Sequence, residues 1–124
     1  MRFVFAAVLI GACSAPASAQ SMPLETFVQK GNALKRKGPL ALLSGDLKLL
    51  QNEMRGAGDA LRSERLAAIK AGKKPAYCPP ESGVSMDAGE VLASLNAIPA
   101  AQRARMTSKD GFRQYMARRF PCRG

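Results

Sequence analysis

Hydrophobic residues recur every three or four positions along much of the chain, which is the spacing of one face of an α-helix. The first of these stripes predicts a helix over residues 24–37. Pro23 suits its first turn, and three basic residues before Gly38 suit the negative C-terminal end of a helix. The apolar positions of this helix are Leu24, Phe27, Val28, Gly31 and Leu34.

A second and longer helix is predicted after a break at Gly38-Pro39 and a short apolar piece, residues 40–43. Ser44 and Asp46 offer capping side chains at its start, and it ends near residues 71–72. Gly56 and Gly58 lie within one turn of it, and because each costs about 1 kcal/mol relative to alanine, the pair predicts a close helix crossing or a kink. Its stripe consists of Leu47, Leu50, Met54, Ala57, Leu61, Leu66 and Ile69.

Two more helices are predicted in the C-terminal half. One covers residues 85–98 with Ser85 as its cap, and the other opens at Thr107, where Thr107 and Asp110 have the spacing of a capping box. Their apolar faces consist of Ala88, Val91, Leu92, Leu95 and Ile98 in the first, and Phe112, Tyr115, Met116 and Phe120 in the second. Because no segment alternates like a strand, the pattern predicts an all-α bundle of about four helices.

The first nineteen residues have the pattern of a cleavable signal peptide. One basic residue, Arg2, precedes the apolar residues 3–12, and Ala17-Ser18-Ala19 form a small-residue cleavage site. As a helix the apolar run covers about 15 Å, half of a hydrocarbon core of ~30 Å, so no transmembrane segment is predicted. We therefore expect export to the periplasm or beyond, with residues 20–124 as one domain.

A second interpretation of the same segment is lipidation. Residues 10–13, Ile-Gly-Ala-Cys, resemble a lipoprotein box, in which Cys13 is acylated and becomes the new N-terminus. Cleavage after Ala19 is preferred because residues 17–20 form a good ordinary site, and lipidation at Cys13 is the alternative.

Cys78 and Cys122 form an even pair, which in an exported chain indicates a disulfide. A metal site is disfavoured, since two cysteines in a chain without histidine supply too few soft ligands. No metal or other cofactor is predicted.

The chain is strongly basic, with 19 Lys and Arg against 9 Asp and Glu and a net charge of +10. This excess indicates an acidic partner or an anionic surface, or a solvated basic surface without a ligand. Binding of nucleic acid is not predicted, because the aromatic residues do not alternate with a basic run as a stacking platform requires.

The residues that enzymes use most often are missing, which makes binding the better prediction than catalysis. Without histidine, neither a Ser-His-Asp nor a Cys-His arrangement can form. Glu53 and Asp59, the two carboxylates of the long helix, are six residues apart and so lie on separate faces. We therefore predict that the protein is not an enzyme.

Three segments together resemble the Rap/Tai immunity proteins. They are Tyr77-Cys78-x-Pro80, the amphipathic helix that ends at Ile98-Pro99, and Phe120-Pro121-Cys122. The N-terminal half is similar over Phe27, Gly31-Asn32 and Leu34, and over Gly56-x-x-Asp59-Ala60. Two further cysteines that members of this family often carry are missing here, near Lys37 and at Leu50.

The resemblance implies a periplasmic, helical and often dimeric protein that binds and inhibits a peptidoglycan amidase toxin delivered by type VI secretion. The partner would be the cognate amidase effector, with a homodimer also possible within the family. For the contact surface we select residues 73–83, which Pro75, Pro79, Pro80 and the disulfide would hold in one conformation. The candidate contact residues are Lys73, Lys74, Tyr77 and Glu81.

A different class of function is also consistent with the charge. In this alternative the protein is a non-enzymatic accessory protein of the cell envelope that binds anionic surface polymers. Salt distinguishes the two, because screening shortens from ~10 Å at 0.1 M to ~3 Å at 1 M and weakens polyanion binding more than a shape-matched interface.

Overall fold

The fold is built from helices alone in the part of the chain that the computed structural model describes, residues 21–123. The predicted signal segment and Cys13 lie outside these residues. In chain order the elements are α1 (Leu24–Lys37), the 3-10 helix η2 (Gly38–Leu43), α2 (Gly45–Lys70), α3 (Ala88–Asn96), α4 (Ala100–Arg103) and α5 (Ser108–Arg119). The all-α prediction is confirmed, and α4, a single turn, makes five α-helices where about four were predicted.

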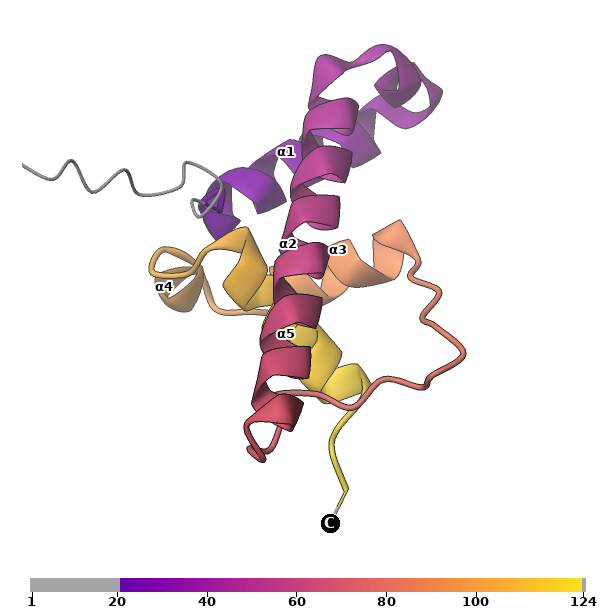
Figure 1. Cartoon of the computed structure of the whole chain (residues 1–124). Coiled ribbons are helices and arrows are strands. Elements are labelled where there is room, and N and C mark those ends of the chain that lie inside the picture. Colours follow the sequence, from indigo (N-terminus) through magenta and orange to yellow (C-terminus); the bar gives the residue numbers. More distant parts are fainter. Residues whose placement is uncertain (1–20, 124) are drawn as a thin grey trace, which may run out of the picture.

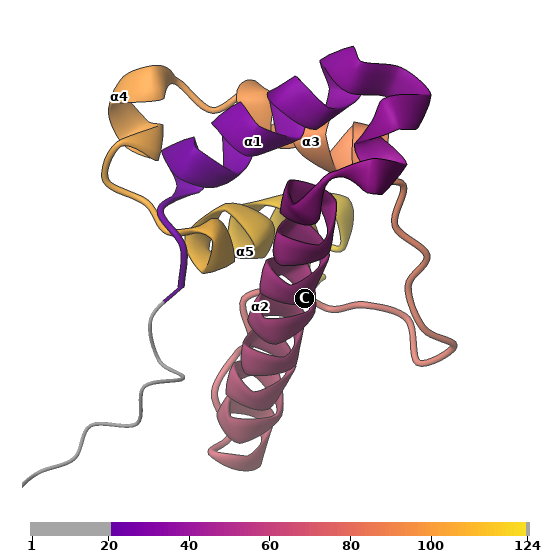
Figure 2. The ribbon, with the colours of Figure 1, turned by 90° about the horizontal axis from the view of Figure 1, so that it is seen from above.

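Helix α2 crosses α1, α3 and α5 on one side, and its last turns extend beyond them (Figures 1 and 2). Ser44 caps it as predicted, because the Ser44 hydroxyl accepts a hydrogen bond from the Asp46 N–H. The prediction that Leu66 and Ile69 extend its buried stripe is wrong, since they are 49% and 51% exposed. They lie on the part of α2 that no other helix covers.

The predicted close crossing at Gly56 and Gly58 is also wrong. A Cβ atom at either position would meet nothing within 4 Å. The close approach occurs at Gly111 of α5, where a Cβ would lie 2.8 Å from Leu24 Cδ1 and 3.0 Å from Leu95 Cδ2. Gly111 therefore lets α5 approach α1 and α3 more closely than a larger residue would allow.

The cap of helix α3 lies two residues later than predicted. Asp87, rather than Ser85, is its cap, and the Asp87 carboxylate accepts a hydrogen bond of 2.9 Å from the Glu90 N–H. The helix ends at Asn96, and Pro99 then starts α4. A carboxylate at the cap is favoured by the positive end of the helix dipole, which favours Asp87 over Ser85 as the start of this helix.

The predicted capping box of α5 is confirmed. The Thr107 hydroxyl accepts a hydrogen bond from the Asp110 N–H, and the Asp110 carboxylate accepts one from the Thr107 N–H. On the apolar side, the rings of Phe112 and Phe27 meet edge to face with their centres 5.1 Å apart.

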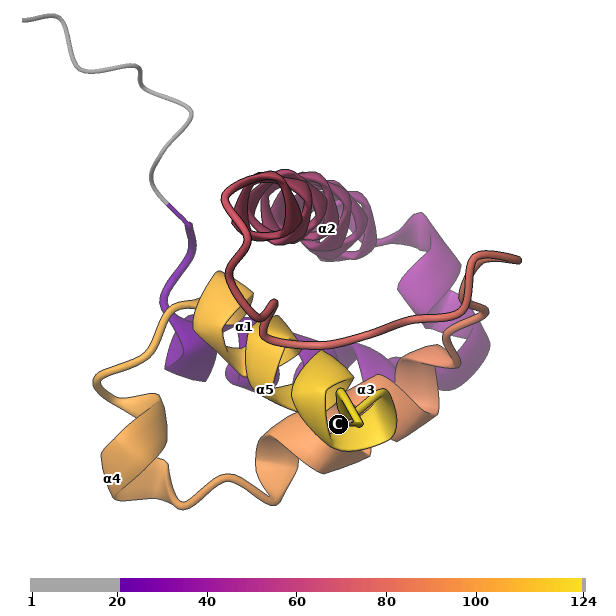
Figure 3. The same ribbon diagram turned by 60° about the horizontal axis from the view of Figure 1, so that its bottom comes forward.

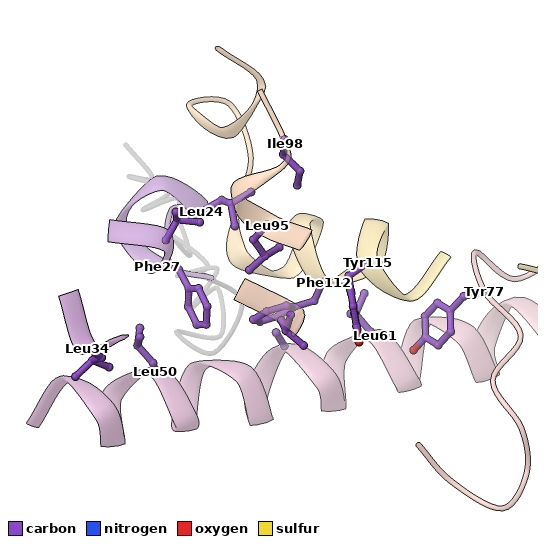
Figure 4. Close-up of a cluster of buried hydrophobic side chains, with 13 residues drawn as sticks. Leu24, Phe27, Leu34, Leu50, Leu61, Tyr77, Leu95, Ile98, Phe112 and Tyr115 are labelled. Carbon is purple, nitrogen blue, oxygen red and sulfur yellow. The ribbon is translucent and has the colours of Figure 1, made fainter. Parts of the chain in front are cut away.

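The hydrophobic core runs along one side of α2 and receives side chains from α1, α3, α5 and the loop after α2 (Figure 4). Leu24 and Leu95 are completely buried at its centre. The predicted disulfide is confirmed between Cys78 and Cys122, whose Cα atoms are 5.0 Å apart. Among residues 21–123, no helix has the length and apolar character needed to cross a membrane.

Candidate functional site

The predicted contact segment, residues 73–83, belongs to a loop without helix or strand that connects α2 to α3. It passes beside the C-terminal end of α5 before it reaches α3 (Figure 3). Lys73, Lys74 and Glu81 are exposed on it. We call residues 71–87 the bridge loop.

The bridge loop is held against the helices at three points. Cys78 is bonded to Cys122, and the Cys78 N–H donates a 2.8 Å hydrogen bond to the carbonyl oxygen of Phe120. Farther along, the carbonyl oxygen of Ser85 accepts a 2.8 Å hydrogen bond from the Arg119 guanidinium. Together with the burial of Tyr77, these contacts fix the path of the loop.

Tyr77 is not a surface residue of the loop, contrary to its selection as a contact residue. It is only 5% exposed and belongs to the hydrophobic core, with the Arg65 guanidinium 5.9 Å from the centre of its ring. Of the four selected residues, Lys73, Lys74 and Glu81 remain available to a partner. An aromatic residue next to a cysteine and two prolines does not reveal by itself whether its ring turns inward.

A small cavity of about 160 Å³ separates the first part of the bridge loop from α2 and α5. Its lining consists of Leu61, Glu64, Arg65, Ala68, Ala76, Tyr77 and Arg113. The carboxylate of Glu64 binds both Lys109 and Arg113, and Arg113 also binds Asp110 at 2.9 Å. The hydrogen bonds from Lys109 and Arg113 lower the pKa of Glu64. These charges are therefore paired with one another beside the loop.

A larger apolar groove, of about 360 Å³, lies between α1, α2 and α3. Its lining consists of Phe27, Gly31, Leu34, Lys35, Leu47, Leu50, Gln51, Met54, Ala88, Gly89, Val91 and Leu92. Gly31 faces Leu92, whose Cδ1 atom would be only 2.8 Å from a Cβ at that position. Sequence reasoning did not find this groove, because its walls come from three helices that are distant in the sequence. Gly31, on the apolar face of the first predicted helix, was the available signal.

Glu53 has a structural role that the sequence did not reveal. Its carboxylate accepts hydrogen bonds from the Ser108 hydroxyl, the Met22 N–H and the Ser21 hydroxyl. Ser108 is fully buried, and its N–H donates to the carbonyl oxygen of Met22 at 2.7 Å. Glu53 thus joins the N-terminal segment and α5 to the middle of α2, and we call this set of contacts the Glu53 clamp.

The Glu53 clamp makes the free energy of unfolding depend on pH in the acid range. Burial raises the pKa of Glu53, but the hydrogen bonds from Ser108, Met22 and Ser21 outweigh it and hold this pKa below the ordinary value of 4.5. A folded-state pKa below that of the unfolded chain means that the stabilisation is complete above the unfolded value. It is lost as the pH falls from about 4.5 through the folded value.

We expect Glu53→Gln to lower the free energy of unfolding by about 1–2 kcal/mol at pH 7, because hydrogen bonds to an ionised acceptor are replaced by weaker ones. The difference from the parent should shrink as the pH falls below 4.5, the ordinary carboxyl value. Urea unfolding at a series of pH values measures both effects. Glu81→Gln, on the exposed bridge loop, is the matched control and should change little. A constant difference across the acid range would contradict the assignment.

Within residues 21–123 no three Cys, Asp or Glu side chains gather in a way that could hold a metal ion. Comparison with other proteins also identifies no family for this chain. No family model, curated protein or solved structure matches it.

Proposed function

We propose that this protein is a periplasmic immunity protein that binds a peptidoglycan amidase and inhibits it. The single observation that carries the proposal is the bridge loop, an exposed segment fixed by a disulfide, a buried tyrosine and backbone hydrogen bonds. The signal-like N-terminus and the resemblance to the Rap/Tai proteins supply the compartment and the class of target.

A fixed loop suits an inhibitor because binding then orders little that was free before. Each rotamer-rich side chain or loop that becomes immobile on association costs about 0.5–1.5 kcal/mol, and a pre-formed loop avoids part of this cost. The bridge loop meets the condition, since Cys78 and Ser85 anchor it to the end of α5 on either side of its exposed turn. The turn closes with the Gly83 N–H donating to the carbonyl oxygen of Pro80.

Exposed positive charge on the bridge loop would steer the approach of an acidic partner. Lys73 and Lys74 are exposed at the start of the bridge loop, and no ion pair involves either of them within residues 21–123. Two adjacent cations on a fixed loop would attract an acidic rim on the amidase. They would act on the association rate more than on the final affinity.

The test is inhibition of a peptidoglycan amidase, sought among the products of the genes that neighbour this one and assayed by cleavage of purified peptidoglycan. We expect the parent protein to abolish cleavage near one-to-one stoichiometry, and Lys73→Glu/Lys74→Glu to slow the onset of inhibition by at least about tenfold. Lys35→Glu/Lys37→Glu makes the same charge change at the end of α1 and is the matched control. Equal inhibition by the two double variants would mean that the bridge loop is not the contact surface. No inhibition by the parent would contradict the immunity proposal itself.

The alternative, an accessory protein that binds anionic envelope polymers, is favoured by a different observation. The positive charge is spread over the surface, with Arg36, Lys48, Lys70 and Arg118 exposed as well as the loop lysines. Binding of this kind should weaken steeply with salt and should respond similarly to charge reversal anywhere on the surface. Parallel binding measurements with the two double variants at low and high salt therefore separate the alternatives.

A further inference from the structure

Four exposed leucines gather where α1 turns through η2 into α2, and we call Leu40, Leu42, Leu43 and Leu49 the leucine corner. The three leucines of η2 are 67%, 77% and 86% exposed, and Leu49, in the first turns of α2, is 43% exposed. The corner projects at the opposite end of the molecule from the C-terminus (Figure 1). Single exposed leucines are ordinary on protein surfaces, but three in one short 3-10 helix, with a fourth at the start of the next helix, are the kind of local apolar surface that interaction sites carry.

The leucine corner is bordered by positive charge. Lys35, Arg36, Lys37 and Lys48 are all exposed around it, and none of the four forms an ion pair within the described part of the chain. The one carboxylate in this stretch, Asp46, binds Lys30 at 3.0 Å. The surroundings of the leucines therefore carry uncompensated positive charge.

The combination of residue types distinguishes between possible occupants. Interfaces with other proteins are enriched in aromatic residues, methionine and arginine and depleted in lysine, and leucine is under-represented among their strongest contacts. Aliphatic side chains bordered by lysine and arginine are instead the pattern of segments that lie in the surface of an anionic bilayer. The leucine corner and the charged residues that border it comprise four leucines, three lysines and one arginine, with no aromatic residue.

The backbone of the corner is also suited to a lipid surface. Peptide N–H and C=O groups that reach the hydrocarbon region need partners within the protein, because no water is present there. Residues 38–43 form a 3-10 helix, Pro39 has no N–H to satisfy, and the Ser44 N–H donates to the carbonyl oxygen of Ala41. The leucine side chains can therefore enter the acyl boundary while the turn keeps its own hydrogen bonds.

We propose that the leucine corner docks on the surface of an anionic phospholipid bilayer, with its leucines inserted at the acyl boundary and its four cations at the headgroups. The docking is peripheral. It does not depend on the amidase proposal, because the bridge loop and the corner are separate surfaces at different ends of α2.

The experiment uses the purified protein and vesicles of phosphatidylglycerol and phosphatidylcholine in equal parts, with pure phosphatidylcholine vesicles for comparison. The chain has no tryptophan, so Leu43→Trp introduces a single fluorophore that responds to polarity. We expect its emission to shift to the blue with the anionic vesicles only. Ile69→Trp, at the far end of α2 on a position that is 51% exposed, should not shift.

Co-sedimentation with the same vesicles measures the two contributions. We expect Leu42→Ser/Leu43→Ser to lower the partition coefficient by at least about tenfold through lost apolar contact. We expect a similar loss for Lys35→Glu/Lys37→Glu, since each cation near an anionic surface contributes about fivefold. The matched controls, Leu66→Ser/Ile69→Ser and Lys73→Glu/Lys74→Glu, make the same changes away from the corner and should lower binding less. Circular dichroism of every variant checks that the helices are retained.

Three results would overturn the proposal. One is binding by the Leu42→Ser/Leu43→Ser variant that equals the parent, which would leave only electrostatic adsorption of a basic protein. Another is a blue shift for Ile69→Trp equal to that for Leu43→Trp. The third is no binding to anionic vesicles, and concentration-dependent self-association lost in the leucine variant would then assign the corner to a second copy of the chain.

Discussion

Replacing both Cys78 and Cys122 with serine should lower the free energy of unfolding by about 2–4 kcal/mol, the usual cost of removing a native disulfide from a small secreted domain. The bridge joins residues separated by 44 positions, so its loss frees a long loop in the unfolded chain. It also loosens the bridge loop in the folded protein, because the burial of Tyr77 and the hydrogen bonds at position 78 and at Ser85 must then hold the loop without the covalent link. Urea unfolding of the parent and the variant, both under oxidising conditions, measures the loss.

The double variant should also lose inhibition of the amidase by more than its unfolded fraction accounts for, because the bridge loop is held less firmly without the disulfide. Ser82→Ala, in the same loop but outside the bridge, is the control and should match the parent in both measurements. If reduction of the parent leaves its unfolding midpoint unchanged, the stabilising role of the bridge is wrong.

Leu95→Ala is expected to lower the free energy of unfolding by about 2–5 kcal/mol, the usual cost of large-to-small changes in cores. This loss is as large as that from removing the disulfide. Leu95 is completely buried, and its side chain lies against Gly111 where α3 meets α5. α3 is a helix of only 9 residues, so it has few other contacts with which to compensate. Since a domain of this size has a total stability of about 5–15 kcal/mol, thermal unfolding followed by circular dichroism should show a large shift.

Leu66→Ala is the matched control, because it removes the same atoms from a helix position that is 49% exposed. It should change the stability by much less than Leu95→Ala. Similar losses at the two positions would mean that α3 is not anchored to the core as described.

The local signals in the sequence predicted the helices well, and the tertiary contacts explain where they failed. Thr107 and Asp110 form the predicted capping box because their interaction involves only neighbouring residues. Leu66 and Ile69 continue the stripe of α2 at helical spacing, but whether a stripe is buried depends on how far the neighbouring helices reach. Periodicity describes a face of a helix and not what covers it.

The candidate site was predictable only in part, for the same reason. The position of the disulfide followed from an even pair of cysteines in a chain predicted to be exported, and it located the bridge loop. That Tyr77 turns inward depends on Arg65 and the core around it, which the sequence does not place nearby. The hydrogen bonds of Glu53 with Ser21 and Ser108 span 32 and 55 positions, and no local pattern predicts such contacts.

The Glu53 clamp has a consequence for the order in which the molecule can be assembled. Ser21 and Ser108 meet across 87 positions, and the Leu24 N–H donates to the carbonyl oxygen of Met106. A chain that emerges from its N-terminus therefore has α1 and α2 free long before α5 arrives to cover them. Their shared apolar stripe stays open to water through most of synthesis, as in other chains whose first and last segments pack together. An unfinished chain that exposes this stripe is prone to aggregate until α5 has been made.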